Sequence, residues 1–352
     1  MNQVKERGQS WLGWVGLAIG AIVLLLAAGS GVESNAMPEK DPKKIVGPKE
    51  CGECHKAEVH TWRETKHSRS FKELPRKKEA KEVAEKLGVK RMKKDSACLN
   101  CHFTSGIKKG KSKAIVGISC ESCHSPAKDW LKVHSDYGGK TVTREMETPE
   151  HKAKRLAAIK ASGMIRPPEL YRLAANCFQC HTIPNEHLVN VGGHKAGSEF
   201  DLVAWSQGEV RHNFFSSGGK KNTEASSERK RMLYVVGASL DLEYSLRALS
   251  KATEKGAFLE AMVKRVGKAM GKLKKIHGLV TISELKEMLA IAAKVKLGAN
   301  QEAQITPAAD KIRAVAQKVA NNYDGSEWAA IDKVLPTADK YKGKPGKAPP
   351  GK

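Results

Sequence analysis

All eight cysteines of this chain occur in four Cys-x-x-Cys-His boxes, and this feature constrains the fold more than any other. The boxes are Cys51-Gly-Glu-Cys54-His55, Cys98-Leu-Asn-Cys101-His102, Cys120-Glu-Ser-Cys123-His124 and Cys177-Phe-Gln-Cys180-His181. This spacing is typical of c-type haem attachment. Two thiols three residues apart form thioethers with one porphyrin, and the next imidazole binds its iron. The sequence therefore predicts four covalently bound haem c groups, with these cysteines as attachment points and these histidines as proximal ligands.

Two other kinds of site use paired cysteines. Four pairs could form two all-cysteine zinc sites, because structural zinc sites have similar pair spacing. They could also form disulfides, although Cys-x-x-Cys disulfides are usually redox-active. Neither alternative explains why a histidine follows every pair when histidine occupies only 12 of 352 positions. We therefore favour haem attachment.

The N-terminus has the pattern of an export segment. Lys5 and Arg7 precede an apolar run over residues 11–28, which are the basic and apolar regions of a signal peptide. The run covers 18 residues, close to the minimum for a membrane-spanning helix. Residues 1–36 are therefore predicted to be a signal peptide, with a small-residue site at 34–36, or an uncleaved N-terminal membrane anchor. Either alternative predicts a periplasmic location or the outer face of the inner membrane, where haem c is attached.

The net charge bears on partners. The chain carries a formal charge of +24 at pH 7 and a sequence pI near 9.7. Haem propionates offset part of this charge, and the remainder favours encounter with redox partner proteins that have acidic docking surfaces. The alternative is that dispersed lysines only keep the protein soluble. Nucleic acid is not an expected partner, because an exported haem protein rarely meets it.

The boxes and the periodic segments divide the chain. We predict a tetrahaem cytochrome c domain over residues 37–221, a helical bundle over 222–338 and a disordered basic tail over 339–352, rich in Pro, Gly and Lys. The fold class is mainly α with little regular sheet. Aromatic residues make up only 5% of the chain, so porphyrins are expected to supply much of the apolar core.

Local patterns predict individual elements. Thr281 and Glu284 have capping-box spacing, and Thr306-Pro307 predicts an N-cap followed by proline at the first helical position. The short connection over 103–119 predicts a turn or small hairpin, and it makes the second and third haems expected neighbours. Helical periodicity covers residues 77–94, 150–161, 228–251, 254–273, 283–297 and 307–322.

Eight further histidines could complete the iron coordination: His60, His67, His134, His151, His187, His194, His212 and His277. A second imidazole gives a low-spin iron suited to electron transfer, whereas an open position can bind a small molecule. The function therefore depends on how many of these residues reach iron.

Two segments carry a family resemblance. Residues 51–67, from Cys51 through Trp62 to His67, resemble the first haem region of the tetrahaem cytochrome c-554 family, a group of multihaem c-type cytochromes. Residues 117–126, with His134 downstream, are similar to the region of its third haem. The likeness covers roughly residues 48–182 and includes the order and spacing of all four boxes. Members carry electrons from hydroxylamine oxidoreductase in ammonia-oxidising bacteria.

The resemblance implies a set of distal ligands. By it, His67 would bind the iron of the fourth haem and His134 that of the first, while the third would take His212 or His194. The family's second haem is five-coordinate. If both His194 and His212 bind, the second haem, held by His102, is closed as well. The other histidines are expected at the surface: His60, His151, His187 and His277.

Two functions follow from these alternatives. The first is an exported tetrahaem cytochrome that transfers electrons between redox partners, within nitrogen-compound metabolism by the resemblance. The alternative is a reductase of nitric oxide, hydroxylamine or nitrite at a five-coordinate haem. The sequence offers no acid/base constellation near an iron, so we predict no catalytic residues and favour the carrier.

Overall fold

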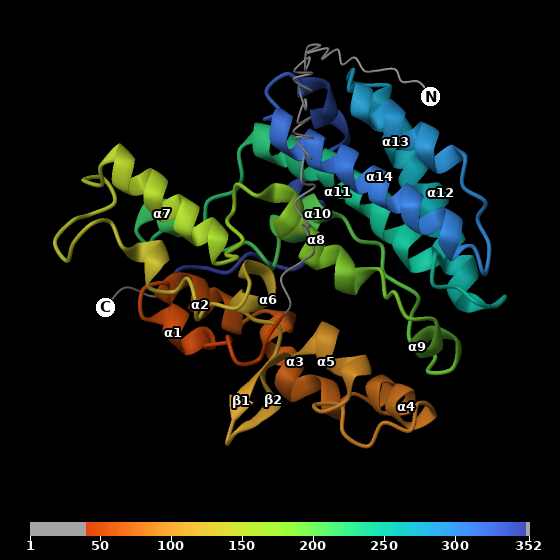
Figure 1. Cartoon of the computed structure of the whole chain (residues 1–352), viewed down its shortest axis with the longest axis horizontal. Coiled ribbons are helices and arrows are strands. Elements are labelled where there is room, and N and C mark those ends of the chain that lie inside the picture. The colour runs from red at the N-terminus through yellow and green to blue at the C-terminus, as the bar shows by residue number, and fades with distance from the viewer. Residues whose placement is uncertain (1–39, 350–352) are drawn as a thin grey trace, which may run out of the picture. The chain divides into compact units, whose positions relative to one another are not determined.

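The computed structural model describes residues 40–349 (Figure 1). The predicted signal or anchor at 1–36 lies outside the described residues. The α-helices and strands are α1 Pro48–Gly52, α2 Lys56–Arg63, α3 Lys66–Glu73, α4 Lys78–Lys86, α5 Ser96–His102, β1 Thr104–Lys108, β2 Lys111–Val116, α6 Cys120–His124, α7 Pro149–Ala161, α8 Leu170–His181, α9 Glu186–Asn190, α10 Leu202–Ser206, α11 Ser227–Leu249, α12 Ala257–His277, α13 Ser283–Ala293 and α14 Glu302–Asn322. The 3-10 helices are η1 Leu74–Arg76, η2 Val133–Ser135, η3 Phe215–Ser217, η4 Ala329–Val334 and η5 Ala338–Lys340. The fold is mainly α, as predicted.

The C-terminal half is a helical bundle built around α11. This helix packs against α12, α14 and the box-four helix α8, and α13 packs against α12 and α14 (Figure 1). The apolar residues of α12 recur every three or four positions, so they line one face of the helix and enter the core. The fully buried or nearly buried members of this stripe are Phe258, Met262, Val266, Ala269, Leu273 and Ile276. Burying each large side chain stabilises the fold by about 1.5–3 kcal/mol.

The box-four helix is anchored in the same core. Leu170, Tyr171, Ala174 and Phe178 of α8 belong to one hydrophobic cluster with the buried face of α11. The fourth box is therefore held by the bundle, whereas the residues around the first three boxes supply few large buried apolar side chains. The domain boundary proposed at 221/222 stays a prediction.

Several helix ends differ from the sequence expectation: the helix expected over 283–297 ends at Ala293, and the one expected over 254–273 runs over Ala257–His277. Helix α14 begins at Glu302, so Pro307 lies inside it and not at its first position. Starting the helix at Glu302 buries Ile305, which continues the apolar stripe of α14. This burial offsets the one backbone hydrogen bond that Pro307, which has no N–H, cannot donate. Helix α13 has Ile282 at its N-cap without a side-chain cap, and Glu284 accepts instead from the Tyr323 hydroxyl at 3.0 Å. The helix expected over 77–94 ends at Lys86, because Gly88 adopts a left-handed conformation (φ +65°).

The predicted hairpin between the second and third boxes is present. Strands β1 and β2 are antiparallel, with Thr104 opposite Val116 and Lys108 opposite Lys111. The two loop residues, Lys109 and Gly110, both have positive φ, as a two-residue type I′ turn requires. Of the two expected forms of this connection, a turn or a small hairpin, the structure has the hairpin.

The prediction of a disordered tail is wrong over residues 339–349. The Lys342 N–H donates to the Ala204 carbonyl at 2.9 Å, and the Lys342 carbonyl accepts from the Glu209 N–H at 2.8 Å. Tyr341 packs against the hydrophobic core. Composition indicated disorder, but these backbone groups and this aromatic ring find partners that lie far away in the sequence.

None of the helices within residues 40–349 is both long enough and apolar enough to cross a membrane.

Candidate haem sites

Short helices position the four boxes. His102, His124 and His181 are the last residues of α5, α6 and α8, and His55 is the N-cap of α2. A box on a helical turn brings both thiols and the following imidazole to one side of the chain, because residues three and four apart share a face. Each box therefore presents its sulfurs and its ring together.

Each box histidine faces one histidine from elsewhere in the chain. The pairs and their ring-centroid separations are His55–His134 at 6.3 Å, His67–His181 at 6.3 Å, His102–His194 at 6.4 Å and His124–His212 at 6.4 Å. Every pair joins one box histidine to one other histidine. The structure thus places His212 beside His124 and His194 beside His102, an alternative that the resemblance left open.

The separation fits one metal atom between the two rings. A metal–imidazole bond is about 2.0–2.1 Å, and a ring nitrogen lies about 1.2 Å from its own centroid, so two imidazoles on opposite sides of one metal have centroids about 6.4 Å apart. Contacting rings would lie closer together, as the stacked rings of His181 and Phe200 do at 4.5 Å. All four histidine pairs have the wider spacing.

Backbone carbonyls orient several of these rings. Nδ1 of His124 lies 2.8 Å from the Ile165 carbonyl, and Nδ1 of His134 lies 2.5 Å from that of Leu131. The corresponding bonds of His194 and His212, to carbonyls of neighbouring residues, are 2.9 and 2.7 Å. An imidazole that donates from Nδ1 leaves Nε2 free for a metal, which is the usual arrangement at metal-binding histidines.

Burial favours the neutral form of the box histidines. Burial lowers the pKa of His102, His124 and His181 to about 4 in each case. It also lowers the pKa of His67 and His134. These rings are therefore neutral near pH 7, as a metal ligand must be.

The region around His67 explains the residues that carry the family resemblance. A Cβ on Gly117 would lie 2.1 Å from the His67 carbonyl, so only glycine allows this approach. The next N–H, of Ile118, donates to the same carbonyl at 3.0 Å, and the Trp62 indole donates to the Ile118 carbonyl at 2.8 Å. Thr65 caps the helix that carries His67. These contacts fix His67 at the start of α3.

Contacts between cysteines show which boxes are neighbours. The Cys51 and Cys120 side chains lie side by side and α1 packs against α6, so boxes one and three meet. The Cys180 side chain lies beside Cys101, and its Sγ is 3.8 Å from the Asn100 carbonyl, so boxes two and four meet. Burial, followed by the nearby Cys123 thiol, raises the pKa of Cys177. The boxes therefore form a row in the order one, three, four, two. The sequence expectation paired boxes two and three, but the thiol contacts join each of them to another box.

A buried carboxylate links boxes one and three. Glu121, within box three, is only 1% exposed. Its Oε1 accepts from the N–H groups of Val46 at 3.0 Å and Ala127 at 2.8 Å, and its Oε2 accepts from that of Gly47 at 2.8 Å. Val46 and Gly47 lead directly into α1 and the first box. Sequence reasoning missed this role, because Glu121 occupies a variable position of the motif.

Three buried donors near the third and fourth boxes lack hydrogen-bond partners among the described residues. They are the Trp205 indole N–H, Nε of Arg211 and Nη2 of Arg265. Trp205 lies beside the His181 ring, and Nη1 of Arg265 donates to the His181 carbonyl at 3.0 Å. Arg211 directly precedes His212. Buried donors normally have partners, and carboxylates such as haem propionates would supply them. These donors therefore fit a haem-binding site.

The structure forms no disulfide among the eight cysteines, and within residues 40–349 no group of three or more His, Cys, Asp or Glu side chains is placed to hold a single metal ion.

The remaining histidines lie apart from the boxes. His60 and His187 are exposed, and His151 contacts Glu147 at 2.8 Å. Among the described residues, none of these rings, nor that of His277, lies beside a box histidine.

Comparison with known proteins gives a family. The family model for cytochrome c554 and c-prime matches residues 50–125. Cytochrome c-554 of Nitrosomonas europaea is 29% identical over 171 residues, which are 46% of this chain and 65% of that protein. Over the matched residues, the haem-box region is similar to the cytochrome c-554 family of c-type cytochromes.

The match has limits in length. The chain covers 65% of its relative, which is less than two thirds, and the family match ends at residue 125, one residue after the third box. No solved structure matches the chain.

Proposed function

We propose that this protein is an electron carrier with four haem c groups, each held between two imidazoles. The proximal ligands would be His55, His102, His124 and His181, and the respective distal ligands His134, His194, His212 and His67. The observation that carries the proposal is that four pairs of histidine rings share one spacing, 6.3–6.4 Å, that suits a single metal atom.

The carrier is favoured over a reductase by the second box. A reductase of a small nitrogen species needs an open distal face on the His102 haem. The His194 ring lies 6.4 Å from that of His102, on a loop that begins with Gly192-Gly193. With both rings as ligands, no iron position remains for a substrate. This ligand set departs from the family resemblance, in which the second haem is five-coordinate.

In this proposal the chain's own residues fix the ligands and the neighbours of each haem. Bound between two imidazoles, a haem would supply one-electron chemistry. The row of boxes, with thiol contacts between one and three and between two and four, holds the attachment points close together. Distal residues from α3, η2 and two later loops join segments far apart in the sequence.

Export is part of the proposal. It is supported by the basic and apolar N-terminal pattern of residues 5–28 and by the site of haem c attachment outside the inner membrane. A role in nitrogen-compound metabolism is proposed on the family resemblance.

A basic surface beside the second box supports docking of an acidic partner. An open groove is lined by Lys81, Lys90, Arg91, Lys93 and Lys94, with Glu85 as its acidic member. Because these like charges lie close together, they produce a positive potential that attracts acidic surfaces. We propose that this groove is the docking site of an acidic redox protein at one end of the row of boxes.

The groove is connected to the second box by two aromatic rings. Nζ of Lys93 lies 3.6 Å from the centroid of Phe71, whose ring packs edge-on against Phe103 at 6.1 Å. Phe103 directly follows His102. A partner on the groove would therefore sit close to the second haem.

Docking can be tested on an electrode that carries carboxylate groups. The double variant Lys90→Glu/Lys94→Glu should lower the electron-transfer rate severalfold at low salt, and the difference should disappear at high salt. The control is Lys275→Glu/Lys286→Glu, which makes the same charge change on exposed positions of the bundle. Equal slowing in both variants would mean that only net charge matters and that the groove is no docking site.

The main proposal is tested by counting haems and ligands in the purified protein. Intact mass should exceed the polypeptide mass by four haems. Electron paramagnetic resonance of the oxidised protein should show low-spin iron without a high-spin signal, and carbon monoxide should not bind to the reduced form. Fewer haems, or a persistent high-spin iron that binds nitric oxide, would overturn it.

A further inference from the structure

The proposed distal ligand His212 lies on an irregular loop. Residues 207–226 connect α10 to α11 and contain only the short 3-10 helix η3. The His212 side chain is exposed, and its one hydrogen bond, from Nδ1 to the Val210 carbonyl, is local. A loop of this length loses much conformational entropy when one of its residues is fixed. Other contacts must therefore hold His212 opposite His124.

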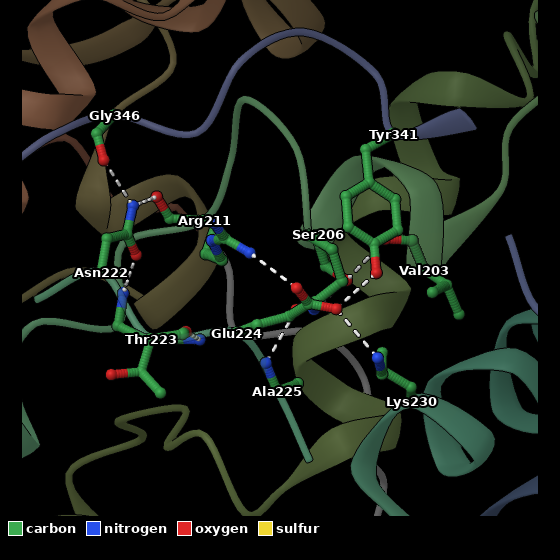
Figure 2. Close-up of polar contacts among 12 residues, drawn as sticks. Val203, Ser206, Arg211, Asn222, Thr223, Glu224, Ala225, Lys230, Tyr341 and Gly346 are labelled. Carbon is green, nitrogen blue, oxygen red and sulfur yellow. Dashed lines mark hydrogen bonds and ion pairs between the residues drawn. The ribbon is translucent and has the colours of Figure 1, made fainter. Parts of the chain in front are cut away.

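Asn222 supplies such contacts on both sides of His212, and its bonds to Arg211 and Gly346 are drawn in Figure 2. Its Nδ2 donates to the Arg211 carbonyl at 2.9 Å, and its Oδ1 accepts from the Asn213 N–H at 2.8 Å. One side chain thus binds the backbone of the residue before His212 and of the residue after it. The same Nδ2 also donates to the Gly346 carbonyl at 2.8 Å.

The Gly346 contact belongs to a longer segment, residues 341–347, which we call the C-terminal strap. Its Tyr341 hydroxyl donates to Glu224 at 2.6 Å, and Glu224 also accepts from Nζ of Lys230 at 2.8 Å and faces Arg211 at 3.6 Å (Figure 2). Tyr341 and Glu224 therefore join the strap to the same loop, through Arg211 beside His212.

The strap fits closely against its neighbours. A Cβ on Gly208 would lie 2.2 Å from the Lys342 carbonyl, and one on Gly346 would lie 2.2 Å from Cγ2 of Thr61. The Glu209 N–H donates to the Lys342 carbonyl at 2.8 Å. The strap is thus in contact both with the loop that carries His212 and with α2, which follows the first box.

We propose that Asn222 and the C-terminal strap are positioning elements that hold His212 on the distal face of the haem attached at Cys120 and Cys123. This inference rests on the proposed function, because it requires His212 to be an iron ligand. It assigns a role to a segment whose composition indicated only a disordered tail. Loss of the contacts should free His212 and open one haem of the four.

The experiment uses the intact holo-protein and compares His212→Ala, Asn222→Ala and a form that ends at Thr337. His212→Ala should convert one low-spin haem to a high-spin haem that binds carbon monoxide when reduced. Asn222→Ala removes three hydrogen bonds and the shortened form removes several, so each should raise the open fraction of that same haem about tenfold or more. The other three haems should stay low-spin in every variant.

Matched variants separate positioning from general stability. Tyr341→Phe removes one hydroxyl-to-carboxylate bond from the strap, and Tyr323→Phe removes an equivalent bond, to Glu284, from the bundle. Only Tyr341→Phe should raise carbon monoxide binding. Lys342→Ala should be silent, because the strap uses the Lys342 backbone. Tyr341→Phe also keeps the test valid if the shortened form fails to fold.

The outcomes distinguish the two proposals. An unchanged spin state in His212→Ala would overturn the ligand assignment itself. If His212→Ala opens one haem while Asn222→Ala, Tyr341→Phe and the folded shortened form keep it closed, His212 is a ligand but the positioning role is wrong.

Discussion

Glu121 offers the sharpest test of how the first and third boxes are held together. Its buried carboxylate accepts three backbone N–H groups, two from residues that lead into the first box and one from Ala127 after the third. Glu121→Gln keeps the shape of the side chain and one carbonyl oxygen. The new amide group, however, cannot accept from the Gly47 N–H.

The expected loss can be worked from these contacts. If the amide oxygen takes the Oε1 position, the bonds from Val46 and Ala127 remain but lose charge assistance, which costs about 1–1.5 kcal/mol each. The buried Gly47 N–H is left without an acceptor, which costs about 1–3 kcal/mol. The free energy of unfolding should therefore fall by about 3–6 kcal/mol. With a slope of about 5 kcal/mol/M for a chain of this size, the guanidinium midpoint falls by about 0.6–1.2 M.

The assay is guanidinium unfolding of the holo-protein followed by far-ultraviolet circular dichroism. The control is Asp129→Asn, because the pair Lys44–Asp129 joins the same two segments at 2.7 Å but is about half exposed. Such a surface pair contributes about 0.2–1 kcal/mol. Equal midpoints for the two variants would refute the claim that the buried carboxylate joins the boxes.

Three further predictions follow from the structure. The ring planes of His124 and His212 cross at 87°, whereas those of His55 and His134 differ by 25°. The third haem should therefore give the most anisotropic low-spin signal in electron paramagnetic resonance, and His212→Ala should abolish that signal and leave the others. Arg155 lowers the pKa of Glu147 to about 2, so the Glu147 charge stabilises the fold above about pH 4.5, and this contribution is lost as the pH falls through about 2. The difference in unfolding midpoint between the native protein and Glu147→Gln should therefore shrink from about pH 4.5 to about pH 2. A difference that stays constant over this range would contradict the assignment. Tyr171→Phe removes the 2.6 Å donor to Oε2 of the buried Glu243, whose Oε1 keeps the bond from Arg247, and it should lower the free energy of unfolding by about 1–3 kcal/mol; an unchanged value in chemical unfolding would show that the Tyr171 hydroxyl adds nothing to stability.

The attachment points can be proposed from the sequence alone because they are local. Two thiols and an imidazole within five residues suffice to bind one porphyrin, so no long-range information is needed. The same holds for the hairpin, whose Lys109-Gly110 turn is a short-range signal, and for the apolar stripe of α12. Family resemblance added His67 and His134, which the structure places beside His181 and His55.

Other features depend on contacts across the chain. The sequence could not choose between His194 and His212, because either loop could reach the third box. Glu121 and Asn222 carry no motif, and their roles appear only when distant backbone groups surround them. The C-terminal strap has the composition of a disordered segment, yet Tyr341 and the Gly346 carbonyl find partners in the loop at 207–226.

The amino-acid sequence by itself predicts haem attachment, through four short boxes whose chemistry is complete within each box. Only the tertiary structure decided which histidine faces which box and which boxes are neighbours. The physical reason is distance along the chain: covalent attachment needs residues that are adjacent in sequence, whereas a distal imidazole comes from a separate segment, and packing and hydrogen bonds set where that segment lies.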